Sequence, residues 1–290
     1  MLSIFVQKAR TVVRHFLYRY PSYLVGKVIC REQMKFIMTN AHETIQKNLF
    51  LYGQFERYTS MLAADLLLTS AKSGEVLDIG ANLGSFAIPL AKELENKGIK
   101  IYCFECQEAV HQQLCANIYI NGLTGFIRAE RTPVSDVVTT INVPIFSLKN
   151  ENFLGSVSLK HEVIEKRKSI TGIAEPCDGD YIKEPMLTTT VDDYCADITV
   201  ALMKIDVEGM EEEVIRGSIK TITRDRPYIL SESWRSNDFK ELRDGLITLL
   251  ESYNYTIFLR EDDIIAFPKE SMGVELLELA QRRGFYERAE

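Results

Sequence analysis

The chain has 290 residues, of which 46% are hydrophobic and 26% are charged, and its formal net charge is −7. This length and composition fit one large domain, or one domain with appendages, and exclude wholesale disorder. No apolar run approaches 18 uncharged residues, so a transmembrane helix is not expected. Arg10, Arg14 and Arg19 interrupt the apolar N-terminus, which is not typical of a secretory signal. We therefore expect a cytoplasmic protein.

Charge is unevenly distributed along the chain. Residues 1–31 contain six basic residues and no acidic one, which leaves a net charge of −13 on the remainder. An acidic body repels phosphate groups, so nucleic acid is not an expected partner. The lone C-x-x-C of Cys103 and Cys106 lacks a second pair of zinc ligands. This pattern predicts reduced cysteines and no zinc site.

Residues 2–20 have the periodicity of a basic amphipathic helix, which Pro21 ends. Such a helix can lie on an anionic membrane surface, here the inner face, or it can pack on its own domain or on a second subunit. Both roles stay open at this point, as does the oligomeric state. We assign residues 1–50 to a basic, helical N-terminal extension and residues 51–290 to the main domain.

From residue 57 onward, strands and helices alternate. The predicted strands are 75–79, 99–104, 126–130, 200–205, 228–231, 255–259 and 264–267, and the predicted helices are 58–71, 85–96, 109–121, 211–223 and 239–252. Alternation with short loops is typical of an α/β fold in which helices cover both faces of a parallel sheet. The four residues between the last two strands predict a hairpin, which would add an antiparallel strand at one edge of the sheet.

Residues 137–190 interrupt this alternation. They are polar, contain Pro and Gly, and include a charged helical stretch at 159–168. The segment is too long for an ordinary connection between two elements of a compact domain. We therefore interpret it as an insertion that contacts the substrate.

The first strand of the pattern leads into a glycine-containing turn, VLDIGANLGSF at residues 76–86. Gly80 permits a tight turn, and Gly84 lets the backbone approach a ligand or the sheet closely. The helix that starts there favours a negative group at its N-terminus. Asp78 could hold a cationic amine directly or through water. S-adenosylmethionine carries both a carboxylate and an amine at its amino-acid end.

Acidic residues also follow the next two predicted strands. Glu105 lies 21 residues after Gly84, close to the roughly 20 expected for a carboxylate that accepts both ribose hydroxyls. Asp136 follows the third strand, where an acid could accept from the adenine amino group. A nicotinamide dinucleotide is the alternative ligand, but its fingerprint is G-x-G-x-x-G rather than G-x-N-x-G. The ordered set predicts a site for S-adenosylmethionine.

Candidate catalytic residues lie on the string MKIDVEGME at 203–211. A sulfonium donor needs in-line alignment, and an alcohol nucleophile also benefits from a base. Strand alternation puts Lys204 and Asp206 on one face, with Glu208 nearby at the open end of the strand. We name Asp206 and Glu208 as the catalytic acids, with Lys204 as their partner. The alternative is that Glu208 belongs with Glu211 to the acidic first turn of the next helix.

A metal is a further option at this end of the sheet. Glu232 follows the next strand and could complete an acidic set with Asp206 and Glu208 that holds Mg²⁺. We do not expect this metal, and we name no metal ligands.

Five stretches of the chain resemble the FkbM family of S-adenosylmethionine-dependent methyltransferases. They are VLDIGANLGSFAIPLA (76–91), YCFECQEAVHQQLCANIYING (102–122), PVSD (133–136), TVDDY (190–194) and LMKIDVEGMEEEVIRG (202–217). Residue by residue, the resemblance places the donor site at Asp78, Gly80, Asn82, Gly84, Glu105 and Asp136. Cys106 departs from the family pattern, which usually has proline after the acid.

This resemblance covers about residues 55–260 and implies a Rossmann-like class I methyltransferase fold. It implies a seven-stranded, mostly parallel sheet with one antiparallel strand, and methylation of hydroxyl groups on sugars or natural products. We therefore expect an S-adenosylmethionine-dependent O-methyltransferase that acts on a small-molecule or glycan acceptor. The alternative is a membrane-associated, non-catalytic binding protein on the same fold, which residues 2–20 suggest. The intact donor motif argues against this alternative.

Overall fold

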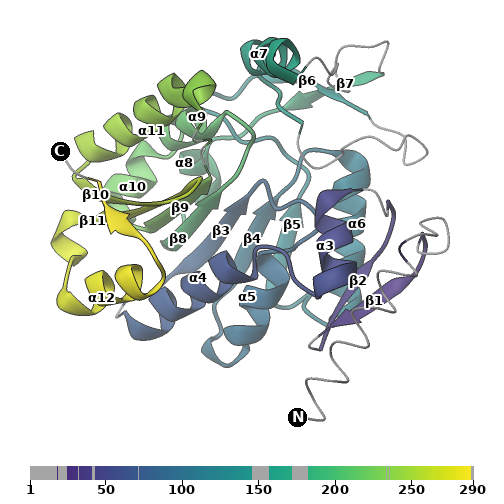
Figure 1. Cartoon of the computed structure of the whole chain (residues 1–290), viewed down its shortest axis with the longest axis horizontal. Coiled ribbons are helices and arrows are strands. Elements are labelled where there is room, and N and C mark those ends of the chain that lie inside the picture. Colours follow the sequence, from purple (N-terminus) through teal and green to yellow (C-terminus); the bar gives the residue numbers. More distant parts are fainter. Residues whose placement is uncertain are drawn as a thin grey trace.

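The computed structural model describes residues 18, 25–31, 33–40, 43–70, 72–145, 157–171, 182–232, 234 and 236–288. A central sheet has the strand order β12-β10-β11-β9-β8-β3-β4-β5 (Figure 1). In chain order its strands are β3 (Glu75–Ile79), β4 (Ile101–Phe104), β5 (Ile127–Glu130), β8 (Val200–Ile205), β9 (Tyr228–Glu232), β10 (Tyr255–Arg260), β11 (Asp263–Pro268) and β12 (Tyr286–Glu287).

Strand directions confirm the predicted sheet. The five strands from β5 to β9 in the sheet order are parallel, and β11 is antiparallel to both of its neighbours, β9 and β10. These seven strands are the predicted set, and the two-residue β12 adds an eighth beside β10. The expectation that the antiparallel strand lies at the edge is wrong, because β11 lies between β9 and β10. Its side chains from Ile264 to Pro268 are all buried, which suits an interior strand better than an edge strand.

Helices cover both faces of the sheet, and each face buries a core of its own. The helices whose side chains join the first core are α4 (Arg57–Thr69), α5 (Ala87–Glu93), α6 (Glu108–Ile120) and α12 (Val274–Arg282). Those of the second core are α8 (Val191–Tyr194), α9 (Glu211–Arg216), α10 (Ile219–Asp225) and α11 (Lys240–Ser252). Neighbouring residues of β3 alternate between the cores, with Val76 in the first and Leu77 in the second.

The predicted helix 211–223 is divided into α9 and α10 at Gly217-Ser218. A Cβ atom on Gly217 would lie 2.1 Å from the carbonyl oxygen of Ser135. The helix break therefore lets the chain approach the segment that follows β5.

The described part of residues 25–52 packs on the main domain. A hairpin of β1 (Val28–Arg31) and β2 (Met34–Ile37) precedes α3 (Thr44–Tyr52), and their buried side chains join the first core. The side-chain oxygens of Asn117 on α6 and of Asn121, which directly follows this helix, accept hydrogen bonds from the backbone of β2, each at 2.8 Å. The predicted helix over residues 2–20 lies, apart from residue 18, outside the described residues, and the boundary at residue 50 stays a prediction.

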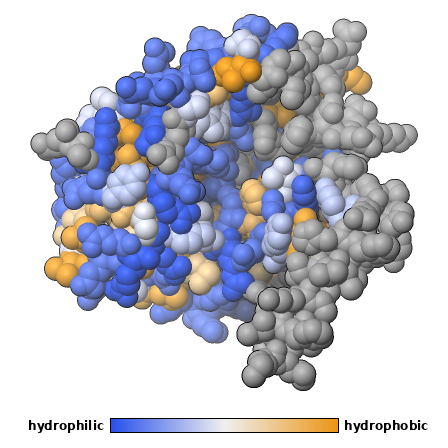
Figure 2. Space-filling model, in the orientation of Figure 1, coloured by the Kyte–Doolittle hydropathy of each residue, from blue (hydrophilic) through white to orange (hydrophobic). Residues whose placement is uncertain are grey.

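The insertion forms a second, smaller layer beside the sheet. β6 (Thr140–Pro144) pairs with β7 (Lys183–Leu187) in antiparallel fashion, and α7 (His161–Thr171) occupies the expected helical stretch. On the face shown in Figure 2, hydrophilic side chains cover most of the described surface. Within the ranges given above, no helix has the length and apolar character needed to cross a membrane.

Candidate active site

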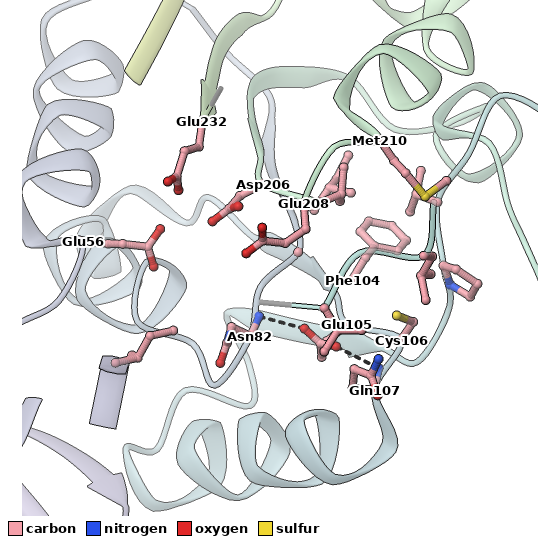
Figure 3. A pocket seen from close by; sticks show the side chains of 18 of the residues that line it. Glu56, Asn82, Phe104, Glu105, Cys106, Gln107, Asp206, Glu208, Met210 and Glu232 are labelled. Atoms are coloured by element: carbon pink, nitrogen blue, oxygen red, sulfur yellow. Dashed lines mark hydrogen bonds between the residues drawn. The ribbon is translucent and has the colours of Figure 1, made fainter. Parts of the chain in front are cut away.

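A cavity of about 230 Å³ opens at the carboxyl ends of the parallel strands (Figure 3). The carboxyl ends of parallel strands meet at one edge of the sheet, where ligands of open α/β folds bind. Each parallel strand contributes to the wall, through Gly80 and Asn82 after β3, 105–107 after β4, 132–134 after β5, 206–208 after β8, and Glu232 at the end of β9. The sequence-predicted strand ends therefore converge on one cavity.

Glu105 is the best-anchored carboxylate of this wall. Its two oxygens accept backbone hydrogen bonds from Asn82 at 3.1 Å and from Gln107 at 2.8 Å (Figure 3). Its side chain is buried, and burial raises its pKa to about 7 although the two backbone donors favour the charged form. The carboxylate is thus held rigidly at the cavity wall between two loops.

Gly80 brings the loops after β3 and β8 into backbone contact. It has φ +85, and a Cβ atom there would lie 1.8 Å from the carbonyl oxygen of Asp206. Next to it, the Asp206 amide donates to the carbonyl oxygen of Ile79 at 2.9 Å. Gly84 differs, because a Cβ atom on it would meet the side chain of Ile88 at 2.9 Å and it does not line the cavity. Gly84 therefore serves helix packing.

Lys204 is the centre of a buried charge cluster. Its Nζ lies 3.1 Å from Glu56, 3.1 Å from Asp206 and 3.8 Å from Asp78. Burial opposes the charge on Lys204, but the three carboxylates raise its pKa well above its usual value. Asp78 is fully buried, and burial raises its pKa to about 7 while Lys204 opposes that rise. Asp78 does not line the cavity, so the structure does not place it for direct contact with a ligand.

Residues 78–257 match the model of the methyltransferase FkbM domain. The chain belongs to this family. It has the Rossmann-like class I methyltransferase fold that the resemblance implied. No curated protein matches the chain by sequence.

Three solved structures illustrate the likeness of the FkbM domain to other methyltransferases. A methyltransferase FkbM from Methylobacillus flagellatus KT is 18% identical, with 76% of this chain and 52% of that chain covered and a TM-score of 0.46. This chain thus spans about half the length of that structure. A putative caffeoyl-CoA O-methyltransferase from Staphylococcus aureus is 13% identical, covering 79% and 92% with a TM-score of 0.42. A Pyrococcus abyssi tRNA (uracil-54, C5)-methyltransferase in complex with S-adenosyl-L-homocysteine is 15% identical, covering 83% and 43% with a TM-score of 0.40.

In the FkbM domain, the loop after β8 is fixed by two contacts. Glu208 lines the cavity at φ +56 and forms an ion pair with Arg167 of α7. Glu211 is buried and accepts from the backbone amides of Val207 at 3.2 Å and Gly209 at 3.1 Å. Burial raises the pKa of Glu211 to about 7. Glu211 thus holds the loop, a role that the sequence analysis missed when it assigned this residue to the helix terminus.

Two further residues of the site were missed. Glu56 lies at the start of α4 with φ +51, where it binds Lys204 and accepts a hydrogen bond from the Ser85 hydroxyl. Gln107 lines the cavity with only 6% of its surface exposed, and neither atom of its side-chain amide has a hydrogen-bond partner within the described part of the chain. Nothing in their local sequence marks either residue.

Asp136, like Gly84, is a predicted donor residue that the FkbM domain places apart from both the cavity and the Lys204 cluster. Its side chain is exposed, its carboxylate accepts from the hydroxyl of Ser135 at 3.1 Å, and residues 132–134 line the wall in its place. Cys106 does line the cavity, and burial raises the pKa of its thiol well above the usual value, so it stays neutral.

The acids of the FkbM domain form no metal cluster in the described residues, where no three His, Cys, Asp or Glu side chains have an arrangement that could hold an ion. Lys204 binds Glu56 and Asp206, and Arg167 binds Glu208.

Proposed function

We propose that this chain binds S-adenosylmethionine in the 230 Å³ cavity and transfers its methyl group to a hydroxyl of a small-molecule or sugar acceptor. Membership of the FkbM family supports the methyl transfer. The observation that carries the proposal is Glu105, a buried carboxylate at the end of β4 that two backbone amides hold at the cavity wall. A carboxylate at this position of an α/β sheet suits a ribose, whose two hydroxyls are both donors.

The wall beside Glu105 fits the rest of a nucleoside. Among the described residues, the buried amide of Gln107 has a donor and an acceptor without partners, and buried polar groups normally have partners in the functional state. An adenine edge offers a complementary amino donor and ring-nitrogen acceptor. The side chains of Phe104 and Val134 line the same wall and provide apolar contact.

The opposite wall is acidic and suits a cation. Glu56, Asp206, Glu208 and Glu232 all line the cavity, and their charges favour a positively charged ligand. S-adenosylmethionine supplies a methyl group that is already activated by the positive charge on its sulfur. The chain's own residues then have to orient the acceptor, exclude water and receive the hydroxyl proton.

Removing the Glu105 carboxylate tests this proposal. E105A should bind S-adenosylhomocysteine about 10- to 100-fold more weakly than the wild type, since hydrogen bonds to a charged group contribute roughly 1.5–3 kcal/mol. Isothermal titration calorimetry measures the change. E108A is the matched control, because Glu108 contacts Gln112 on α6 and does not line the cavity. The proposal fails if the folded wild-type protein does not bind S-adenosylhomocysteine.

The pH dependence of this binding follows from the pKa of about 7 of Glu105. Ribose hydroxyls donate to the ionised carboxylate, so binding favours that form and lowers the pKa. Protein below pH 7 must release a proton to bind, and the affinity should therefore rise from pH 6 to pH 8 and then level off. Calorimetry in buffers of different ionisation enthalpy measures both the affinity and the proton release. E105Q should abolish this rise in affinity and the proton release that accompanies it. An affinity that falls between pH 6 and pH 8 in the wild type would contradict the role of Glu105.

A further inference from the structure

Glu232 lies where two cavities meet. The main cavity and a second cavity of about 60 Å³ have Glu56 and Glu232 in common as wall residues. Polar side chains of the second cavity include Thr59, Ser231 and Asp263, and its volume is sufficient for water. Glu232 therefore faces both the proposed ligand site and a polar compartment behind it.

Glu232 differs from the other three carboxylates of the acidic wall in its contacts. Each of the others has a cationic partner, namely Lys204 for Glu56 and Asp206, and Arg167 for Glu208. In the described ranges, the carboxylate of Glu232 forms neither an ion pair nor a hydrogen bond, and Figure 3 shows it pointing into the cavity. It is thus the carboxylate of this wall that is available to a substrate.

The surroundings of Glu232 disfavour a negative charge on its carboxylate. In the β9–β11 register it lies directly opposite Asp263, and like charges at opposite positions destabilise a sheet. Asp206, Glu208 and Glu56 also repel a negative charge on it, Lys204 opposes them, and Asp263 itself is paired with Arg260. Glu232 is exposed as a whole residue, and repulsion from Asp206, followed by desolvation of the carboxylate beside the cavity wall, raises its pKa to about 8. A carboxylate tuned in this way is a stronger base than an ordinary one.

We propose that Glu232 is the catalytic base that takes the proton from the acceptor hydroxyl. This inference rests on the proposed function. The acceptor oxygen forms its new bond to the methyl carbon while the carbon–sulfur bond breaks, and the electron pair of that bond stays on sulfur. The hydroxyl proton passes to the carboxylate of Glu232, which later releases it to water through the second cavity.

With Glu232 as the base, Asp206 and Glu208 have supporting roles in the site. Asp206 is bound to Lys204 and raises the basicity of Glu232 through its charge, so it is a positioning residue. Glu208 is bound to Arg167 and connects α7 to the loop after β8.

Carbon-13 NMR of the side-chain carboxyl groups, in the full chain saturated with S-adenosylhomocysteine, tests the acid–base behaviour. The wild type should show a glutamate that titrates near pH 8, and E232Q should lack this signal. In D206N the midpoint should move to lower pH, because the main repulsion is gone. If no glutamate titrates near pH 8, or if E232Q retains the signal, the proposal is overturned.

Turnover gives the second test, with an acceptor identified by incubating labelled donor with fractionated host extract. E232Q should lower kcat by about 10²- to 10⁴-fold with little change in the KM of the acceptor. The wild-type kcat should rise with pH up to about 8, and the kcat of E232Q should not show this rise. E241Q is the control, since Glu241 is exposed on α11. Wild-type kcat in E232Q overturns the proposal, whereas absent binding of S-adenosylhomocysteine to the wild type would instead refute the donor site.

Discussion

Replacing Lys204 with methionine is expected to lower the free energy of unfolding by about 3–5 kcal/mol, the usual cost of removing one partner from a buried ion pair. Lys204 is 4% exposed, and its Nζ lies 3.1 Å from both Glu56 and Asp206. Asp78, which is fully buried, would lose its nearest cation as well. Methionine keeps most of the side-chain volume, so the loss reports the missing charge rather than a cavity. Denaturant unfolding followed by circular dichroism measures it.

The pH dependence of K204M separates charge from packing. Burial already raises the pKa of Asp78 to about 7, and without Lys204 that pKa rises further in the folded state, so the folded protein binds more protons than the unfolded chain. Stability lost at pH 8 should therefore return in part as the pH falls toward 5. K160M is the control, because the Lys160–Glu213 pair is partly exposed and should contribute less than about 1 kcal/mol. Equal losses in K204M and K160M would contradict a stabilising role for the buried cluster.

The sheet was predictable because buried parallel strands leave a strong local signal. Runs such as 75–79 and 200–205 are short, apolar and bounded by polar loops, and both form strands at those positions. The hairpin of β1 and β2 was not predicted, because its turn has no glycine or asparagine. Gln33 takes φ +70 there, a conformation that sequence analysis expects of those two residue types.

The site was predictable to the extent that its residues follow strand ends. Glu105 and Asn82 lie next to each other because β3 and β4 are parallel neighbours in register. Glu56 reaches Lys204 only through the packing of α4, which local sequence does not encode. Asp136 was predicted from its position after β5, but the chain contacts the cavity at 132–134 and has left it by residue 136.

A second large effect is expected for G80A, which should lower the free energy of unfolding by more than about 4 kcal/mol. A loss of this size is exceptional for a single substitution. The added Cβ atom would lie 1.8 Å from the carbonyl oxygen of Asp206, and both groups belong to the backbone of adjacent strand ends. A backbone clash cannot be relieved by a rotamer change, so the loops after β3 and β8 would have to separate. This movement would displace both Asp206 and Asn82. G80A should therefore also lose S-adenosylhomocysteine binding at temperatures where it is still folded.

G98A distinguishes the clash from the cost of the backbone conformation. Gly98 has φ +69, close to the +85 of Gly80, but a Cβ atom there would meet nothing within 4 Å. G98A should therefore lower the free energy of unfolding by only about 1–2 kcal/mol, the cost of placing alanine in a left-handed conformation. The difference between the two variants, measured by thermal and denaturant unfolding, isolates the contact between Gly80 and Asp206. If G80A and G98A are destabilised equally, that contact does not constrain the position, and the two loops are free to separate without cost.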